Sequence, residues 1–138
     1  MEKTVSQKLG ISQNARAFFV NAPKNFSDEA VLPKLDLHSQ LTGEFDYIHF
    51  FVVTQKEFHE KFKKLKNHLK PDGVLWVSWP KSNQKETDLN IKTVIKIGYD
   101  YGLVESKAIS INSVWSALKF THPIFGKEYN NSYGKLNS

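Results

Sequence analysis

The apolar positions of the chain alternate between short continuous runs and helical stripes. Two runs, residues 45–53 and 74–79, are apolar on both faces, which is typical of central parallel strands covered by helices on each side. A shorter apolar run at residues 17–20 is followed by Pro23, and we expect a buried strand that ends before this proline. The pattern therefore predicts three buried strands.

A helical stripe follows the second of these strands. Thr54 and Glu57 match a capping box at the start of this helix, and the segment 71–73, Pro-Asp-Gly, is a turn signal at its end. The apolar face of the helix consists of Phe58, Phe62, Leu65 and Leu69.

A second helix is predicted after the third strand, with Thr87 or Asp88 as its cap and Gly102 at its end. Its apolar stripe consists of Ile91, Val94, Ile95 and either Tyr99 or Gly98.

Weaker sequence patterns predict the remaining helices and strands. Short helices are expected over residues 5–11, ending at Gly10, and over residues 27–32 with Ser27 as N-cap. Strands over 103–111 and 114–121 are joined by a tight turn at Asn112 and Ser113. Because strands alternate with helices before this final hairpin, the fold class is α/β, a three-layer sandwich with a mostly parallel central sheet and a C-terminal antiparallel hairpin.

Length and composition fit one globular domain. The 138 residues are 40% hydrophobic and 13% aromatic, which excludes a mainly disordered chain. Because the chain has no cysteine, disulfides, thiolate zinc sites and a cysteine nucleophile are excluded. We expect a single α/β domain over residues 1–125 and a flexible tail over residues 126–138, where no apolar period is present.

The net charge of +5 comes almost entirely from lysine, since Arg16 is the only arginine. The densest cluster, formed by Lys61, Lys63, Lys64, Lys66 and Lys70, shares its stretch with Glu57 and Glu60. Arginine is the preferred side chain for bidentate phosphate recognition, so the lysines favour a solvated helix face over a nucleic-acid site. The N-terminus lacks a signal peptide and no apolar stretch is long enough to span a membrane, so we expect a cytoplasmic location and no membrane partner.

Three segments carry a family resemblance: the strand that begins Phe45-Asp-Tyr-Ile48, the junction Leu69-Lys-Pro-Asp-Gly73, and the strand Val74-Leu-Trp-Val-Ser78. With the helix and hairpin that follow, residues 45–122 resemble the C-terminal half of class I S-adenosylmethionine-dependent methyltransferases. The resemblance implies a Rossmann-like fold, here a degenerate methyltransferase-like one.

The whole chain also resembles a group of small bacterial domains of unknown function. The recurring segments are Val20–Pro23, Trp76–Lys81, Asp88 and Trp115–Ser116. This second resemblance implies no activity.

The N-terminal half departs from the methyltransferase pattern. That family holds its cofactor on a glycine-rich turn after the first strand, where this chain has Asn21-Ala-Pro-Lys24 and contains no G-x-G anywhere. Asp36 is a candidate for the acidic residue that grips the ribose in the family. Only 21 residues, 24–44, stand where the family fits two helices and two strands. On these grounds no cofactor is expected, and the sequence disfavours S-adenosylmethionine.

Open α/β sheets bind ligands outside the carboxyl ends of their strands. The candidate ligand-binding residues at these ends are Asn21, Thr54, Ser78, Trp79, Lys81 and Trp115. An aromatic ring beside a lysine and small polar groups can hold a planar anionic ligand. The alternative is structural, with a tryptophan that closes the core, a threonine that caps a helix and a solvated lysine.

Catalytic and metal-binding signals are weak. His49 lies in mid-strand and is expected to be a buried histidine with a hydrogen-bond partner, and Ser78 and Ser116 lack a G-x-S-x-G elbow. His59 and His68 are nine residues apart on the lysine-rich helix, too far to share a metal. No catalytic or metal-ligating residue is therefore assigned, and the sequence leans away from an enzyme.

Three functional hypotheses remain. The first is a non-catalytic domain that binds a protein partner or a small molecule on a methyltransferase-like scaffold. The second is a small enzyme with a non-standard cofactor or nucleotide site at the strand carboxyl ends, and the third is a weak nucleic-acid binder that uses the lysine-rich helix. Self-association through Phe125, Tyr129 and Tyr133 is left open.

Overall fold

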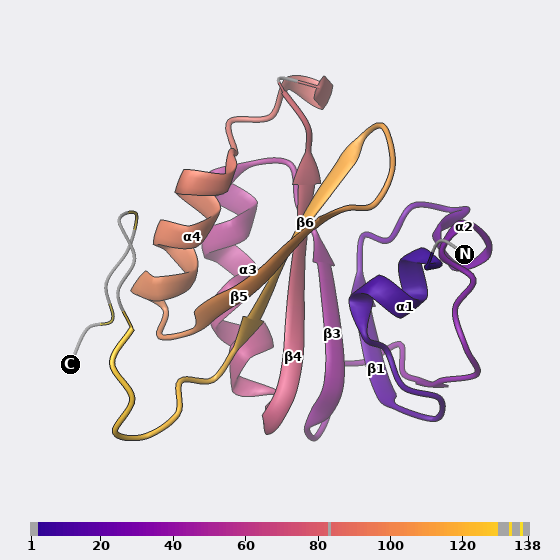
Figure 1. Cartoon of the computed structure of the whole chain (residues 1–138), viewed down its shortest axis with the longest axis horizontal. Helices are drawn as coiled ribbons and strands as arrows, with labels where there is room; N and C mark the ends of the chain where they lie inside the picture. The colour runs from indigo at the N-terminus through magenta and orange to yellow at the C-terminus, as the bar shows by residue number, and fades with distance from the viewer. Residues whose placement is uncertain (1–2, 83, 130–132, 134–135, 137–138) are drawn as a thin grey trace.

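A six-stranded mixed sheet forms the centre of the molecule (Figure 1). The structure is a computed structural model that describes residues 3–82, 84–129, 133 and 136. The strands are β1 (Arg16–Val20), β2 (Asp36–Leu37), β3 (Phe45–Phe51), β4 (Leu69–Pro80), β5 (Val104–Ser110) and β6 (Trp115–Thr121). Their order is β2-β1-β3-β4-β6-β5, with the first four parallel and β6 antiparallel to both β4 and β5. The predicted α/β fold with a C-terminal antiparallel hairpin is confirmed.

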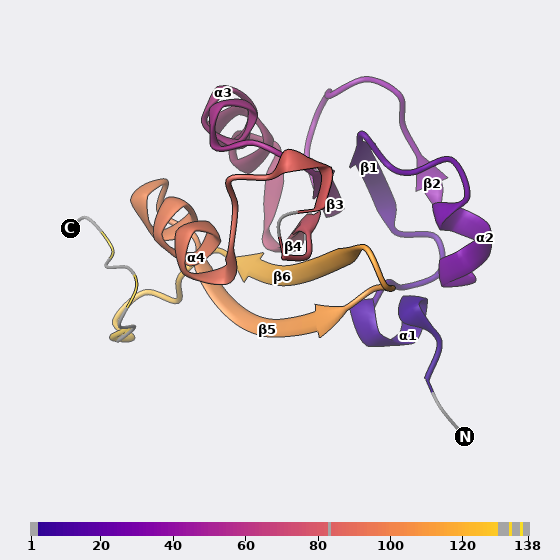
Figure 2. The ribbon, with the colours of Figure 1, turned by 90° about the horizontal axis from the view of Figure 1, so that it is seen from above.

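Helices cover both faces of this sheet. They are α1 (Val5–Leu9), α2 (Phe26–Ala30), α3 (Gln55–Asn67) and α4 (Ile91–Asp100), with a short 3-10 helix η1 at Gln84–Glu86. Figure 2 shows α3 on one side of the sheet and α1 on the other, and the packing places α4 with α3 and α2 with α1. The molecule thus has the three predicted layers.

The strand period of two divides the core between these faces. On β3, Ile48 and Phe50 point towards α3 and α4, whereas Tyr47 and Phe51 point towards α1 and α2. Side chains on both faces of β3 and β4 are buried, as expected for strands in the middle of a parallel sheet. The carboxyl ends of β1, β3 and β4 therefore meet at one edge of a buried core.

The strand β4 begins earlier than the sequence pattern predicts. Helix α3 ends at Asn67, and Leu69 already pairs with Phe45 on β3, so residues 71–73 lie within the strand rather than in a turn before it. The register shifts between the pairs of Phe45 and Tyr47, which places these residues in a bulge. Gly73 suits this position because a Cβ there would lie 2.8 Å from the carbonyl oxygen of Phe45.

Two predicted helix starts are also wrong. Helix α2 begins at Phe26, with Asn25 at the N-cap position, so Ser27 lies inside the helix. Helix α4 begins at Ile91 and is capped by Asn90, whose side-chain oxygen accepts a hydrogen bond from the Thr93 amide, rather than by Thr87 or Asp88. Ile91 consequently stands at the first turn and is 43% exposed instead of belonging to the buried stripe.

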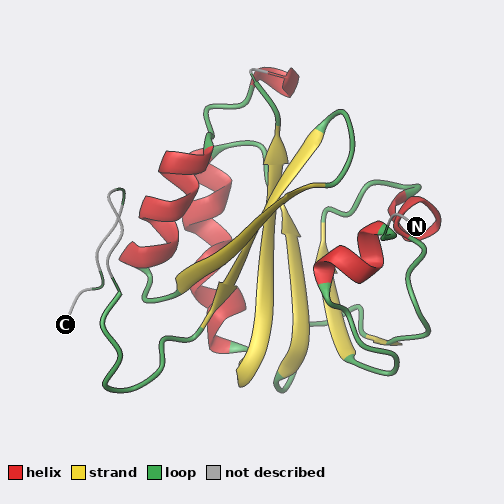
Figure 3. Ribbon diagram, in the orientation of Figure 1, coloured by secondary structure: helices red, strands yellow, loops and turns green. Residues whose placement is uncertain are grey.

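The segment between β1 and β3 is mainly loop (Figure 3). It holds the five-residue α2 and the two-residue edge strand β2, which pairs with Arg16 and Ala17 of β1. The 126–138 segment, predicted as a flexible tail, lies partly outside the described residues, and within it Tyr129 and Leu136 pack against the α3–α4 side of the core. None of the helices in the described ranges is long and apolar enough to cross a membrane.

Candidate functional site

A cleft of about 710 Å³ lies beside the carboxyl end of β4. One wall is the end of β4, the second is the loop that leads into α4, and the third is the β5–β6 hairpin. Its lining residues are Trp79, Lys81, Ser82, Thr87, Asp88, Leu89, Asn90, Ile91, Ala108, Ile109, Ser110, Ser116 and Ala117. The volume is in the range of small-molecule sites in proteins.

The hairpin holds the lysine of the cleft in place. The Lys81 amide donates a hydrogen bond to the Val114 carbonyl over 2.7 Å, and the Lys81 ammonium donates to the Ser110 hydroxyl. Because an ammonium carries three donors, Lys81 keeps further capacity to bind an anionic group. The cleft therefore has a positioned cation on its hairpin side.

The loop wall is anchored to the start of α3. The Thr87 hydroxyl donates to the Val53 carbonyl over 2.6 Å, and an Asp88 carboxylate oxygen accepts from the Gln55 amide over 2.8 Å. The Gln55 side chain returns a hydrogen bond of 2.9 Å to the Asp88 carbonyl. These long-range contacts explain why Thr87 and Asp88 do not cap α4, and they fix an acidic side chain in the wall of the cleft.

The indole of Trp79 completes the set of groups around the cleft. Trp79 points to the α3–α4 side of the sheet and is only 5% exposed, so it presents a small part of its surface to the cleft. Lys81 and Asp88, which carry opposite charges, also line the cleft. This combination of an aromatic surface, a cation and an anion suits a ligand that itself carries a ring and both charges.

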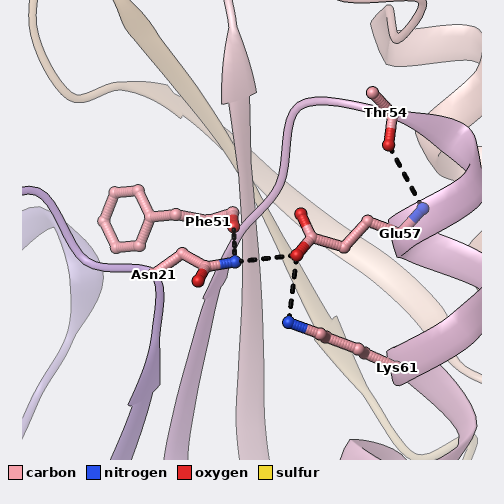
Figure 4. Close-up of polar contacts among 5 residues, drawn as sticks. All are labelled: Asn21, Phe51, Thr54, Glu57 and Lys61. Atoms are coloured by element: carbon pink, nitrogen blue, oxygen red, sulfur yellow. Dashed lines mark hydrogen bonds and ion pairs between the residues drawn. The ribbon is translucent and has the colours of Figure 1, made fainter.

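A second polar cluster joins the carboxyl end of β1 to α3 (Figure 4). The Asn21 amide group donates to the Phe51 carbonyl over 3.2 Å and to the Glu57 carboxylate over 3.1 Å. Lys61 also contacts Glu57, at 3.0 Å. Thr54 caps α3 as predicted, by accepting from the Glu57 amide, but the Glu57 carboxylate lies against Asn21 and Lys61 instead of completing a capping box.

This cluster occupies the turn where the family resemblance places a glycine-rich cofactor loop. Asn21 has a positive φ of 58°, a backbone conformation that asparagine tolerates better than most residues. Its side chain contacts the end of β3 and the first turn of α3, so the two inner strand ends are joined by side chains at this point. The cleft beside β4 lies at a different place on the same edge of the sheet.

The six candidate residues predicted from the sequence do not meet at one site. Trp79 and Lys81 line the cleft, and Asn21 and Thr54 lie at the β1–α3 cluster. The two places are connected through Gln55, the neighbour of Thr54, which is hydrogen-bonded to Asp88.

The other two candidates lie on the α1–α2 side of the sheet. Ser78 is fully buried, and Trp115 packs against Phe51 with ring centroids 5.2 Å apart. The Ser78 hydroxyl contacts His49 Nε2 at 2.6 Å, and the Tyr47 hydroxyl contacts His49 Nδ1 at 2.9 Å. Burial lowers the pKa of His49 to about 3 and raises that of Tyr47, so both are neutral at physiological pH. The prediction of a buried, hydrogen-bonded His49 is confirmed.

Sequence reasoning missed the hairpin side of the cleft. Ala108, Ser110 and Ser116 line the cleft from the two hairpin strands, and the sequence pattern does not assign any of them to a ligand site. Asp88 was proposed first as a helix cap. The polar loop 81–90 after a buried strand is a sequence signal for a binding site, but the sequence does not show that the hairpin forms the other side of that site. In the described part of the chain, no three His, Asp or Glu side chains gather in a way that could hold a metal.

Comparison with known proteins gives matches only among solved structures. No family model and no curated protein matches the chain. A ribosomal protein L11 methylase from Lactobacillus delbrueckii subsp. bulgaricus aligns with a TM-score of 0.54 and 12% identity over 86% of this chain and 74% of its own. A TehB-like S-adenosylmethionine-dependent methyltransferase from Corynebacterium glutamicum gives 0.54 and 9% over 88% and 89%. A 30S ribosomal A1408 methyltransferase from an uncultured bacterium gives 0.50 and 13% over 89% and 96%.

These similarities correct the expectation about cofactors. The missing glycine-rich turn and the short 24–44 segment predict that no cofactor binds and disfavour S-adenosylmethionine, and the similarity to S-adenosylmethionine-dependent methyltransferases contradicts that prediction. The prediction is wrong because a glycine-free turn and a shortened segment after the first strand do not by themselves exclude the ligand. The similarity itself, at 9–13% identity, concerns the fold. The chain therefore has the Rossmann-like α/β fold of S-adenosylmethionine-dependent methyltransferases.

Proposed function

We propose that this domain binds a small ligand in which a planar ring is joined to a zwitterionic chain, and that the ligand occupies the cleft beside β4. The observation that supports this proposal is the presence of Trp79, Lys81 and Asp88 in the walls of one cleft of about 710 Å³. A ring can contact the exposed part of the indole, a carboxylate can pair with the lysine and an ammonium with the aspartate.

S-adenosylmethionine and S-adenosylhomocysteine combine these groups, since each has an adenine ring and an amino-acid zwitterion. The fold shared with the methyltransferases supports the choice of these two compounds as first probes. Asp88 uses one carboxylate oxygen for the Gln55 amide, and a carboxylate can accept several hydrogen bonds, so the residue can also receive an ammonium. Ser116 and Ser110 add hydroxyl groups on the hairpin side.

Isothermal titration of the full chain with S-adenosylmethionine, S-adenosylhomocysteine and adenosine tests the proposal. The two zwitterions are expected to bind, and adenosine is expected to bind more weakly because it lacks the charged chain. Lys81→Met should weaken the binding of both zwitterions roughly tenfold or more, the scale of one lost charge-assisted hydrogen bond. Lys63→Met is the matched control, because Lys63 is exposed on α3 and does not line the cleft.

Asn21→Ala distinguishes the cleft from the turn after β1. Asn21 lies outside the cleft, so this variant should bind the ligands as the unaltered chain does. Loss of affinity in Asn21→Ala with none in Lys81→Met would place the ligand at the turn and contradict our assignment. Failure of both zwitterions to bind the unaltered chain would also overturn the proposal.

A further inference from the structure

A second hollow lies on the α3–α4 side of the sheet, far from the cleft in the order of strands. It is a groove of about 470 Å³ between α3 and β1, lined by Phe18, Val20, Leu41, Glu60, Lys61, Lys64 and Leu65. Its apolar residues pack against the main core, and three of them, Phe18, Val20 and Leu41, are only half-buried. The groove thus has an apolar floor and a charged rim.

The groove lies beside α3, where a third helix in the row formed by α4 and α3 would lie. Packed helices lie 8–10 Å apart, and α3 and α4 already occupy two adjacent positions on this face. The next position in the row lies over β1. Figure 2 shows that the chain contributes an arched loop between β2 and β3 on that side, and no described helix occupies this position. Leu41, from this loop, reaches the groove.

The charges on the rim indicate what could fill it. Both glutamates of α3 are paired with lysines of the same helix, Glu57 with Lys61 at 3.0 Å and Glu60 with Lys56 at 4.0 Å. The exposed Lys64 therefore gives the rim a positive charge that these pairs do not offset. A second copy of this chain, with its net charge of +5, would meet the rim with like charge.

We infer that the groove between α3 and β1 receives an amphipathic helix from an acidic protein partner. The apolar face of that helix would cover Phe18, Val20 and Leu65, and an acidic side chain would lie beside Lys64. A helix in a groove is recognised through apolar positions spaced three and four residues apart, which fits a floor built from one strand and one helix. This inference is independent of the ligand proposed for the cleft.

Selection from a displayed library of random helical peptides, with the full chain as bait, tests the inference. Enriched peptides are expected to combine an apolar stripe with glutamate or aspartate beside it. Fluorescence anisotropy of an enriched peptide should show affinity that falls with added salt, because exposed charges contribute to binding.

Two charge reversals on adjacent exposed residues locate the contact. Lys64→Glu is expected to weaken peptide binding roughly tenfold, whereas Lys63→Glu, outside the groove, should change it much less. Leu41→Ser should weaken binding without a change in net charge. Absence of any enriched peptide, enrichment of peptides without an acidic face, or equal effects of the two reversals would overturn the inference. A dimer of the unaltered chain that Leu41→Ser dissociates would overturn it as well.

Discussion

At the scale of single residues, three buried polar side chains on the α1–α2 side of the core, Tyr47, His49 and Ser78, are linked by hydrogen bonds. His49 accepts or donates at both ring nitrogens, to Tyr47 and to Ser78, and all three side chains are buried. Phe26 covers the histidine ring with centroids 5.3 Å apart, and Phe51 stacks on it at 4.3 Å. A neutral imidazole satisfies this arrangement, because it has one donor and one acceptor.

This environment predicts that stability depends on pH through His49. Its pKa falls from 6.5 to about 3 because burial penalises the charged form, so the unfolded chain binds a proton at this residue that the folded chain does not. The contribution is fully present above pH 6.5 and is lost as the pH falls from there towards 3. Urea unfolding at several pH values should show a free energy of unfolding that falls steadily as the pH is lowered through this window.

His49→Gln provides the comparison for this measurement. Glutamine can hydrogen-bond to Tyr47 and Ser78 but does not titrate, so the stability of the variant should be less sensitive to acid. The variant should also be less stable at neutral pH, because glutamine lacks the ring that packs against Phe26 and Phe51. The other titrating groups are common to both proteins, and the difference between their pH profiles isolates His49. Parallel profiles for the two proteins would show that His49 is protonated equally in the folded and unfolded states.

At the scale of elements, the sequence pattern predicted the helix features that depend on neighbouring residues. It did not predict the helix start that depends on long-range contacts. The stripe residues Phe58, Phe62 and Leu65 and the Thr54 cap follow from neighbouring residues and were predicted correctly. Leu69, predicted as the last residue of the stripe, instead begins β4 and pairs with Phe45. The start of α4 was not predicted correctly, because Thr87 and Asp88 have good capping side chains that bind Val53 and Gln55 instead. Those partners are more than 30 residues away in the sequence.

The assignment of Asn90 as the cap of α4 leads to a prediction for this helix. Asn90→Ala removes the hydrogen bond from the Thr93 amide to the side-chain oxygen, 3.0 Å in length, and should lower the free energy of unfolding by about 1 kcal/mol. Asn90→Asp keeps the acceptor and adds a negative charge at a helix N-terminus, so it should preserve stability. Urea denaturation measures both. An Asn90→Ala variant as stable as the unaltered chain would show that Asn90 is not the effective cap.

At the scale of the whole molecule, the doubly apolar strands were sufficient to predict the layers and the parallel sheet. The candidate site was predicted less completely, since Trp79 and Lys81 were found but Ser78 and Trp115 point to the opposite face. A strand fixes which residues share a face, but the pattern of a strand buried on both sides does not show which face leads to a cleft. The position of the cleft depends on the loops and the hairpin, which come together only in the folded chain.

The topology also predicts how stability is distributed across the sheet. β3 and β4 are central strands, paired on both sides over residues 47–50 and 75–78 and buried on both faces there, whereas β2 is a two-residue strand at the edge. Amide hydrogen exchange should therefore be slowest for residues 48–50 and 75–77, which are expected to exchange only through global unfolding. The amides of Asp36 and His38, which bond to Ala15 and Ala17, should exchange far faster, through local opening of the edge. Equal protection at the edge and at the centre would mean that β2 opens only together with the core, and that the 24–44 segment is an integral part of one cooperative unit despite its short elements.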